Sequence, residues 1–125
     1  MVVDITNRVD TTTWDGLAMP PGSSATWEIA SLLPEGTRVV KAFNTTFAPT
    51  VAAGEVAGQQ LDVLIAGDDE EAKRKVSQLV SDAGLRPIDA GDLRRAEQLE
   101  HLGLLHISLQ EPRGLGFGST MKLHP

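Results

Sequence analysis

Cysteine is absent from this 125-residue sequence, and cations are scarce, since 11 Lys and Arg residues face 17 Asp and Glu residues for a net charge of −6. Without cysteine the chain can form neither disulfide bonds nor thiolate metal sites, and the absence fits a cytoplasmic protein. The acidic balance argues against a nucleic-acid partner, because phosphate binding requires clustered cations. The three histidines lack metal-ligand spacing with nearby carboxylates, so we expect no metal site.

The sequence also lacks long apolar runs. No stretch approaches the roughly 20 residues that a membrane-spanning helix needs, and no basic segment followed by an apolar one begins the chain as in a secretory signal. We therefore expect no membrane partner and a cytoplasmic location. The length and the hydrophobic content of 41% predict a single domain over 1–125 with a core of its own.

Apolar positions alternate between strand-like and helix-like patterns. The strand-like runs are 2–5, 37–43, 61–67 and 85–91. Helical spacing follows over 24–33, 47–56 and 68–83, and then in a long C-terminal helix within 91–110. This alternation over 1–90, with mostly continuous apolar strands, predicts an α/β fold in which a parallel sheet carries helices on both faces. Residues 111–125 are expected to form a tail.

Polar residues at the helix ends predict where three of these helices begin and one ends. Ser24 is expected to cap the first helix, and Asp68, with Glu71 three residues on, resembles a capping box for the third. Asp92 is expected to cap the last helix. Gly84 follows the third helix, as glycines commonly do at that position.

Oxygen- and nitrogen-rich side chains follow every predicted strand, at 4–7, 41–46, 66–70 and 89–92. Ligands of parallel α/β sheets bind beyond the carboxyl ends of the strands, so several such ends in succession indicate the rim of a site. At 66–70 and 89–92 a helix cap is the better interpretation, because a well-patterned helix follows. After Asn7 and after Asn44 to Thr46 only weak helix signals follow, which favours a ligand site.

Other polar or aromatic residues have a structural interpretation. Lys41 lies within an apolar strand, where contact with a carboxylate is expected. His106 is expected to be a core or half-buried helix residue, and Trp27 to pack among helical apolar residues. The pair Arg94 and Arg95 is expected on a solvated face.

Several segments together carry a resemblance to a known family. They are VVDITN, RVVKAFNT, LDVLIAGDDEEAK, VSQLVSDAGLRPIDAG and a terminal FGS–MKL, in that order between Val2 and Leu123. The sequence resembles the NADP oxidoreductases that depend on the deazaflavin coenzyme F-420. It is also similar to the reductase domain of the six-transmembrane metalloreductases, which shares the fold and several of these motifs.

One hallmark of that family is absent. Its members begin with a strand, a turn of the G-x-G-x-x-G type and a helix, which together hold the pyrophosphate of the dinucleotide. The only glycine series here, Gly114, Gly116 and Gly118, follows a helix and lies in the tail. The resemblance therefore implies the C-terminal portion of a Rossmann (NADP-binding) fold, with the first βαβ half missing.

The resemblance implies direct hydride transfer between NADP(H) and a deazaflavin or flavin-like acceptor, with no catalytic acid, base or nucleophile. The cofactors would be NADP(H) and coenzyme F-420 or a flavin. Asn7 would lie beside the nicotinamide ribose, and residues 44–48 along the interface between the two rings. The implied cofactor-binding residues are Thr6, Asn7, Asn44, Thr45, Thr46, Ala48, Phe117, Gly118 and Ser119.

Two functions remain open on the sequence. The chain is either a segment of an NADP-dependent oxidoreductase, inactive by itself, or a truncated, non-catalytic α/β module that dimerises. A sheet that has lost neighbouring strands exposes unpaired backbone groups, so we expect a homodimer in either case. The choice between NAD and NADP, the physiological acceptor and the direction of hydride flow stay open as well.

Overall fold

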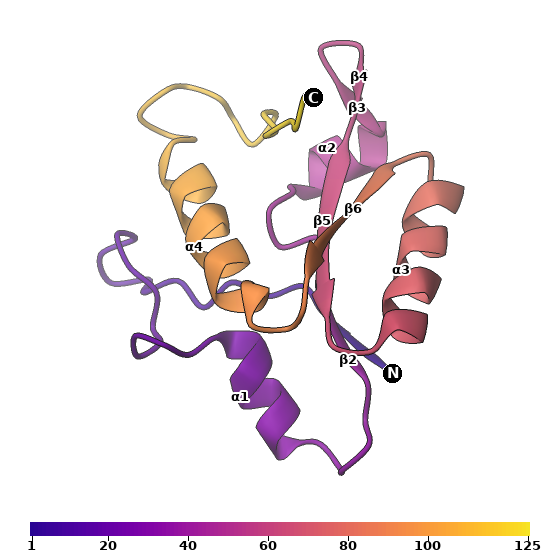
Figure 1. The fold of residues 1–125 in the computed structure, drawn as a ribbon. Coiled ribbons are helices and arrows are strands. Elements are labelled where there is room, and N and C mark those ends of the chain that lie inside the picture. Colours follow the sequence, from indigo (N-terminus) through magenta and orange to yellow (C-terminus); the bar gives the residue numbers. More distant parts are fainter.

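The computed structural model describes residues 1–125, and its main sheet has four strands in the order β1-β2-β5-β6 (Figure 1). These strands are β1 (Val2–Asp4), β2 (Val39–Ala42), β5 (Asp62–Gly67) and β6 (Arg86–Gly91). A small second sheet pairs β3 (Glu55–Val56) with β4 (Gln59–Gln60). The helices are α1 (Ala25–Leu32), α2 (Ala48–Ala53), α3 (Glu70–Asp82) and α4 (Arg95–Ser108).

Helices cover both faces of the main sheet, which confirms the α/β class and the partial Rossmann-like architecture. Figure 1 shows α3 on one side of the sheet and α1 with α4 on the other. Between α3 and the strands lies the core, built on the four-residue spacing of Ala72, Val76 and Val80 in α3. That spacing places these side chains on one face of the helix, toward the buried strand residues Val40, Ala42, Val63 and Ile65.

The sheet is mostly parallel, but its central pair is not. Strand β1 runs parallel to β2 and β5 parallel to β6, whereas β2 and β5 are antiparallel, with Lys41 opposite Ala66. A parallel return from β2 to β5 would need a long crossover. Helix α2 has 6 residues, or about 9 Å, which is too short to bring the chain back along the sheet.

The antiparallel junction corrects one expectation about the site. The carboxyl ends of β1 and β2 lie side by side at one end of the sheet. Those of β5 and β6 lie side by side at the opposite end, because β2 and β5 run in opposite directions. The four strand ends therefore do not share one rim, as their succession indicated, and the ends at 66–70 and 89–92, where the sequence favoured helix caps, lie away from those that carry Asn7 and Asn44. The ends that carry Asn7 and Asn44 are neighbours, and those of β5 and β6 are neighbours of each other only.

The predicted helix over 47–56 is shorter than expected. It ends at Ala53, because Gly54 adopts a left-handed φ of 77° that stops the helix. The chain then forms the β3–β4 hairpin, which the sequence reading missed. Its two turn residues, Ala57 and Gly58, both have positive φ, at 53° and 74°, as in tight two-residue hairpin turns.

The predicted helix ends are confirmed in part. The Ser24 hydroxyl accepts from the Trp27 backbone N–H, and Gly84 follows the C-cap of α3 with φ 78°. The cap of α3 is not Asp68 but Asp69, whose carboxylate accepts from the Ala72 N–H at 2.8 Å. Asp68 is drawn away, because its carboxylate accepts from the N–H of Leu93 at 2.9 Å.

Asp92 does not occupy the cap position of α4. The helix begins three residues later, at Arg95, after a turn in which the Asp92 carbonyl accepts from the Arg95 N–H. The Asp92 carboxylate binds the backbone and side chain of Arg94 instead. None of the helices has the length and apolarity needed to cross a bilayer.

Candidate functional site

Two asparagines join the carboxyl ends of β1 and β2. The side-chain amide of Asn7 donates to the backbone carbonyl of Asn44 at 2.6 Å, and the amide of Asn44 donates to Oδ1 of Asn7 at 2.9 Å. The sequence placed both residues beyond neighbouring strands, and the structure brings them into direct contact. Their contact defines the centre of the candidate site.

Helix α4 covers this amide pair. Asn44 is only 4% exposed, and its amide also donates to the carbonyl of Leu99 in α4 at 2.8 Å. A Cβ at Gly103 would lie 2.8 Å from Oδ1 of Asn7, so only glycine allows α4 to approach this closely. Sequence reasoning missed Gly103, although a glycine inside a helical pattern is a signal of close packing.

The chain leaves β2 in a strained conformation. Phe43 has φ 64°, a left-handed value that costs a non-glycine residue on the order of 1 kcal/mol or more. Its carbonyl accepts from the backbone N–H of Thr46 and from the Thr46 hydroxyl, at 3.2 and 2.7 Å. This turn explains why an apolar strand ends in a polar cluster, and it leads directly into α2 at Ala48.

A buried charge cluster lies beside the pair. The Lys41 ammonium donates to the carboxylates of Asp4 and Glu100 at 2.9 and 3.1 Å, and to the carbonyl of Thr6 at 2.6 Å. All three side chains are nearly inaccessible to solvent. The expected contact of Lys41 with a carboxylate is confirmed. By binding the carbonyl of Thr6, Lys41 also fixes the backbone just before Asn7.

The two carboxylates of this cluster also hold α1. Glu100 accepts from the backbone N–H groups of Ala25 and Thr26 at 2.7 and 3.4 Å, which places its charge at the positive end of the helix dipole. The Thr26 hydroxyl donates to Asp4 at 2.6 Å. Burial raises the pKa of Asp4, but the hydrogen bonds from Thr26, Lys41 and Thr6 outweigh it and hold that pKa below its usual value.

On the other side of Asn44, His106 joins α4 to residue 45 and to the tail. Its Nδ1 lies 3.2 Å from the carbonyl of Thr45, and its Nε2 lies 2.9 Å from the hydroxyl of Ser119. Because a carbonyl only accepts, Nδ1 carries the proton, and Nε2 of the neutral ring accepts from Ser119. Burial lowers the pKa of His106, which outweighs the opposing effect of the Thr45 carbonyl and keeps the ring neutral.

The tail folds back over this network. Gln110 donates to the Ser119 hydroxyl at 2.9 Å and accepts from the backbone N–H of Phe117 at 3.1 Å. The Phe117 ring meets Phe47 edge-on, with centroids 5.1 Å apart, and Phe47 lies 4.4 Å from the His106 ring. Residues 117–119 thus lie next to the segment that follows Asn44. Gln110 and Phe47 were not singled out from the sequence.

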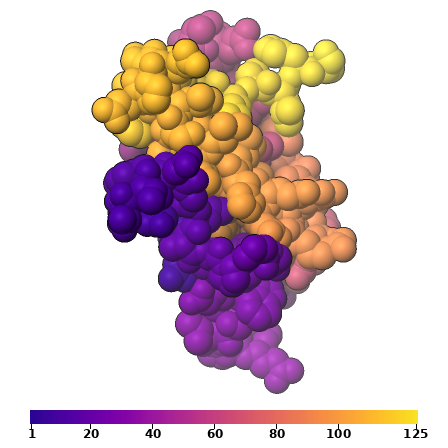
Figure 2. Space-filling view, turned by 90° about the vertical axis from the view of Figure 1, so that its left-hand side faces the viewer, coloured from indigo at the N-terminus to yellow at the C-terminus, as the bar shows by residue number.

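A cavity of about 560 Å³ opens beside the tail. It lies where the loop after β1 faces the end of α4 and the tail, and Figure 2 shows these segments, indigo and gold, on one face of the molecule. Its lining residues are Thr13, Trp14, Asp15, Ile107, Ser108, Glu111, Pro112 and Phe117. The cavity therefore adjoins the candidate site through Phe117.

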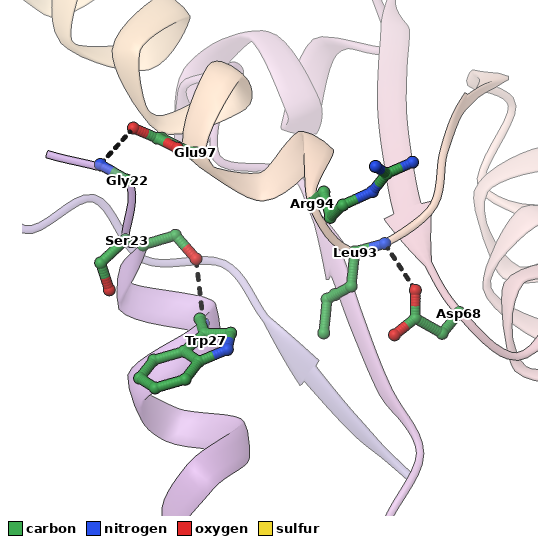
Figure 3. Close-up of a pocket in the computed structure, with 8 residues that line it drawn as sticks. Gly22, Ser23, Trp27, Asp68, Leu93, Arg94 and Glu97 are labelled. Carbon is green, nitrogen blue, oxygen red and sulfur yellow. Dashed lines mark hydrogen bonds between the residues drawn. The ribbon is translucent and has the colours of Figure 1, made fainter.

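A second cavity, of about 460 Å³, lies between the starts of α1 and α4 (Figure 3). Glu97 accepts there from the N–H of Gly22, and Asp68 from that of Leu93. Trp27 flanks this cavity and is 64% exposed, so the expectation that it packs inside is wrong. Helix α1 buries Ala25 and Thr26 against the protein, and the next residue points away.

Two further observations concern charge. The Arg94 side chain is 90% exposed and pairs with Asp92, in agreement with a solvated face. No group of three or more His, Asp or Glu side chains is arranged to hold a metal ion.

Comparisons with known proteins point in one direction. No family model matches the chain. Metalloreductase STEAP3 of Rattus norvegicus is 43% identical over 76 residues, which are 61% of this chain and 15% of that protein. A solved structure from Arthrobacter sp. FB24, described as a candidate F-420-dependent NADP reductase, superposes with a TM-score of 0.85 at 30% identity over 99% of this chain.

A second solved structure, of a hypothetical protein from Sinorhizobium meliloti, matches with a TM-score of 0.63 at 35% identity over 74% of this chain. The chain spans 57% of the Arthrobacter structure and 45% of the Sinorhizobium structure. The resemblance to an F-420-dependent NADP reductase and to a metalloreductase, over a part of each, is confirmed, and so is the Rossmann-like α/β class.

Proposed function

We propose that this chain forms the nicotinamide and acceptor side of an NADP-dependent oxidoreductase, where hydride passes between NADP(H) and a deazaflavin or flavin-like acceptor. The observation that carries the proposal is the Asn7–Asn44 amide pair at the adjacent carboxyl ends of β1 and β2. Ligands of this class of sheet bind beyond the carboxyl ends of the strands. The similarity to an Arthrobacter NADP reductase supports the choice of cofactor.

The residues at the carboxyl ends of β1 and β2 fit the nicotinamide end of NADP(H). Oδ1 of Asn44 is buried without a hydrogen-bond partner, and leaving a buried acceptor unpaired costs about 1–3 kcal/mol. Thr45 uses its carbonyl to bind His106, and its hydroxyl enters none of the hydrogen bonds of the fold. The free hydroxyl of Thr45 suits the carboxamide of the nicotinamide or a hydroxyl of the ribose, whereas Oδ1 of Asn44 lies beneath the surface.

This chain offers few groups that could bind the phosphates of a dinucleotide. Phosphate binding in this class of fold uses backbone N–H groups of a glycine-rich turn between a strand and a helix, and no G-x-G-x-x-G occurs in the sequence. The N–H groups that begin α1 already bind Ser24 and Glu100. We therefore expect this chain alone to bind NADP(H) weakly or not at all, and to be inactive alone.

The chain's own part in the reaction is positioning. The nicotinamide, when bound, supplies or accepts the hydride, so no protein acid or base has to act. Asn7, Asn44 and Thr45 would orient the nicotinamide nucleotide, while Phe117 would cover the acceptor and exclude water. His106 is a positioning residue, because both of its ring nitrogens are engaged by Thr45 and Ser119.

Reduced nicotinamide mononucleotide tests this proposal, since it lacks the adenosine half and needs no pyrophosphate-binding turn. We expect a weak, saturable change in its fluorescence on titration with the protein. Thr45→Val should weaken binding about fivefold, as loss of one hydrogen bond does. Thr37→Val, before β2 and away from the carboxyl ends, is the matched control. Equal affinity of wild type and Thr45→Val, or no saturable binding, would contradict the proposal.

A second candidate is a non-catalytic module that forms a homodimer. It is favoured by β1, a three-residue edge strand whose flanking residues Met1 and Ile5 are exposed. Light scattering at micromolar concentration tests it. A dimer that fails to bind the mononucleotide would support this candidate, and a monomer that binds it would exclude it.

A further inference from the structure

The carboxyl ends of β5 and β6 form a second pair of adjacent parallel strand ends, at the other end of the sheet from Asn7 and Asn44. The cavity of about 460 Å³ opens there, between the starts of α1 and α4 (Figure 3). It is lined by Asp68, which follows β5, and by Leu93, which follows β6. Ligands of α/β sheets bind beyond such strand ends, and the volume is typical of small-molecule sites. The proposed function leaves this cavity without a role.

An exposed tryptophan forms one wall of the cavity. Trp27 lies on α1 and is 64% exposed, whereas Ala25 and Thr26 beside it are buried. Figure 3 shows its indole on one side of the cavity and the side chain of Leu93 on the other. An indole face left in water makes apolar contact with aliphatic carbon and attracts cations through its π-electrons. These two walls therefore suit an aliphatic chain that carries positive charge.

Two carboxylates stand at opposite ends of the cavity (Figure 3). Oδ1 of Asp68 accepts from the N–H of Leu93 at 2.9 Å, and Oε1 of Glu97 accepts from the N–H of Gly22 at 3.0 Å. The other oxygen of each carboxylate has no hydrogen-bond partner in the protein, and neither group belongs to an ion pair. Each carboxylate therefore offers a ligand a negative charge and one free acceptor oxygen.

Arg94 is the only cation that lines the cavity, and it is engaged elsewhere. Its guanidinium donates to the Asp92 carboxylate from Nε and from Nη2, at 3.1 and 2.7 Å. Figure 3 shows its side chain directed away from Trp27. Nearby backbone N–H groups, which could bind an anion, already donate to carboxylates. Because the whole chain also carries a net charge of −6, the cavity favours cations over anions.

We propose that this cavity binds a linear aliphatic polyamine. One terminal ammonium group pairs with Asp68 and the other with Glu97, while the methylene chain crosses Trp27 and Leu93. A compact cation reaches only one of two carboxylates at opposite ends of a cavity, whereas a polyamine carries separated charges on an apolar stem. The inference goes beyond the proposed function, because the cavity lies at the other end of the sheet from the amide pair.

Spermidine, which has a primary ammonium group at each end, is the probe. Spermidine acetylated at both ends keeps the chain but loses the terminal charges, so it is the matched ligand control. The chain has two tryptophans, and NMR of their indole N–H groups separates this site from the rest of the surface. We expect spermidine to shift the Trp27 signal saturably and to leave that of Trp14 in place. The diacetylated form should bind about tenfold more weakly, and 1 M salt should remove most of the difference.

Replacing the indole tests the aromatic wall. Trp27→Ala should weaken spermidine binding about fivefold, as loss of one cation–π contact does, and the backbone amide of Leu93 then reports the titration. Trp14→Ala is the matched control, since Trp14 is exposed to a similar extent, and it should leave the affinity unchanged. Thermal unfolding of both variants checks that the fold is intact.

Replacing the carboxylates tests the charge argument. The double variant Asp68→Asn, Glu97→Gln keeps the oxygens that accept from the backbone and should weaken spermidine binding about tenfold. The double variant Asp15→Asn, Glu55→Gln removes two charges at exposed positions outside this cavity and should change the affinity less than about twofold. The comparison separates a local contact from the attraction of the whole acidic chain.

Four results would overturn the inference: no saturable shift of the Trp27 signal, equal binding of the diacetylated form, equal losses in the two double variants, or equal losses in the two tryptophan variants. A blocked Lys-Gly-Gly-Lys peptide adds a fifth, because it carries two ammonium groups on a protein backbone. If it binds more tightly than spermidine, the occupant is a protein segment and the polyamine assignment fails. Binding of reduced nicotinamide mononucleotide, which tests the proposed function, is independent of all five.

Discussion

Gly103 lies so close to Asn7 that a Cβ at position 103 would stand 2.8 Å from Oδ1 of that asparagine. The same Cβ would lie 3.0 Å from the carbonyl of Asn44. The contact ties α4 to the ends of β1 and β2, and it makes the position of the amide pair depend on a single residue without a side chain.

Gly103→Ala should therefore destabilise the protein, although alanine is the better helix former by about 1 kcal/mol. The added methyl group would push α4 from the amide pair, and such overpacking costs about 1–3 kcal/mol. We expect a lower midpoint in urea unfolding and a weaker affinity for reduced nicotinamide mononucleotide. His101→Ala, at an exposed position of the same helix, is the control and should change neither.

Asn44→Ala should lower the free energy of unfolding by about 1–3 kcal/mol. Asn44 is buried and binds both Asn7 and Leu99, so its truncation leaves buried polar groups without partners. Val40→Ala, in the core, should cost a similar 1–3 kcal/mol. Thr45→Val, which removes a hydroxyl without a partner in the fold, should leave stability within about 0.5 kcal/mol of wild type.

The effects of these substitutions on turnover should follow the opposite order to their effects on stability. In a fusion with the first half of the Arthrobacter relative, Thr45→Val should reduce NADPH oxidation while Val40→Ala leaves it nearly normal at low temperature. A shift of about 1 Å between reacting rings can cost on the order of a hundredfold in rate. Normal turnover by Thr45→Val and by a folded Asn44→Ala would show that the cluster is only structural.

Lys41→Met should destabilise the protein by about 3–5 kcal/mol at pH 7, because it leaves Asp4 and Glu100 buried without their cation. In this variant the folded-state pKa of Asp4 should rise above the unfolded one, because burial raises it and the opposing hydrogen bond from Lys41 is lost. Stability should then increase as the pH falls from 7 toward 4, the reverse of wild type. Urea unfolding at several pH values measures this, with Lys75→Met, an exposed lysine paired with Glu71, as the control.

Asp62 should account for much of the acid sensitivity of the wild type. Burial raises its pKa, but hydrogen bonds from Arg86, Lys122 and the Leu123 N–H outweigh this effect and hold the pKa far below its usual value. A lowered folded-state pKa stabilises the protein above the unfolded pKa of about 4, and this stabilisation is lost as the pH falls below it.

Asp62→Asn should therefore be less stable at pH 7 by about 2 kcal/mol and lose less on acidification from pH 5 to pH 2. The variant should also release the tail near Leu123, which faster amide hydrogen exchange in residues 120–125 would report. An unchanged acid transition would show that other carboxylates dominate it.

Local patterns in the sequence predicted the elements well and their connections less well. The spacing of Ala72, Val76 and Val80 reports a buried helix face directly, and the polar residues after β1 and β2 mark a real meeting point. Strand β5 runs antiparallel to β2 because α2 is too short for a crossover. Helix α2 is short because Gly54, with its left-handed φ, ends it. Such a turn cannot be read from hydrophobic periodicity.

The sequence predicted only part of the candidate site, again because local patterns do not report contacts between distant elements. Residue types at strand ends suggest where ligands bind, so Asn7 and Asn44 could be named. Gly103, Gln110 and Phe47 act through contacts between elements far apart in the chain, which no local pattern encodes. Likewise Glu100, on a helix face, reveals its role only through Lys41 and the start of α1.

Amide NMR of this 13.3 kDa chain titrated with reduced nicotinamide mononucleotide tests the central claim most directly. We expect the side-chain amides of Asn7 and Asn44 and the backbone amide of Thr45 to shift together with one dissociation constant. NADPH should produce the same shifts with an affinity within about threefold, because the chain adds no phosphate-binding turn, and adenosine monophosphate should produce none. A micromolar dissociation constant for NADPH, far tighter than for the mononucleotide, or shifts confined to the opposite edge around Trp27 and Asp68, would contradict it.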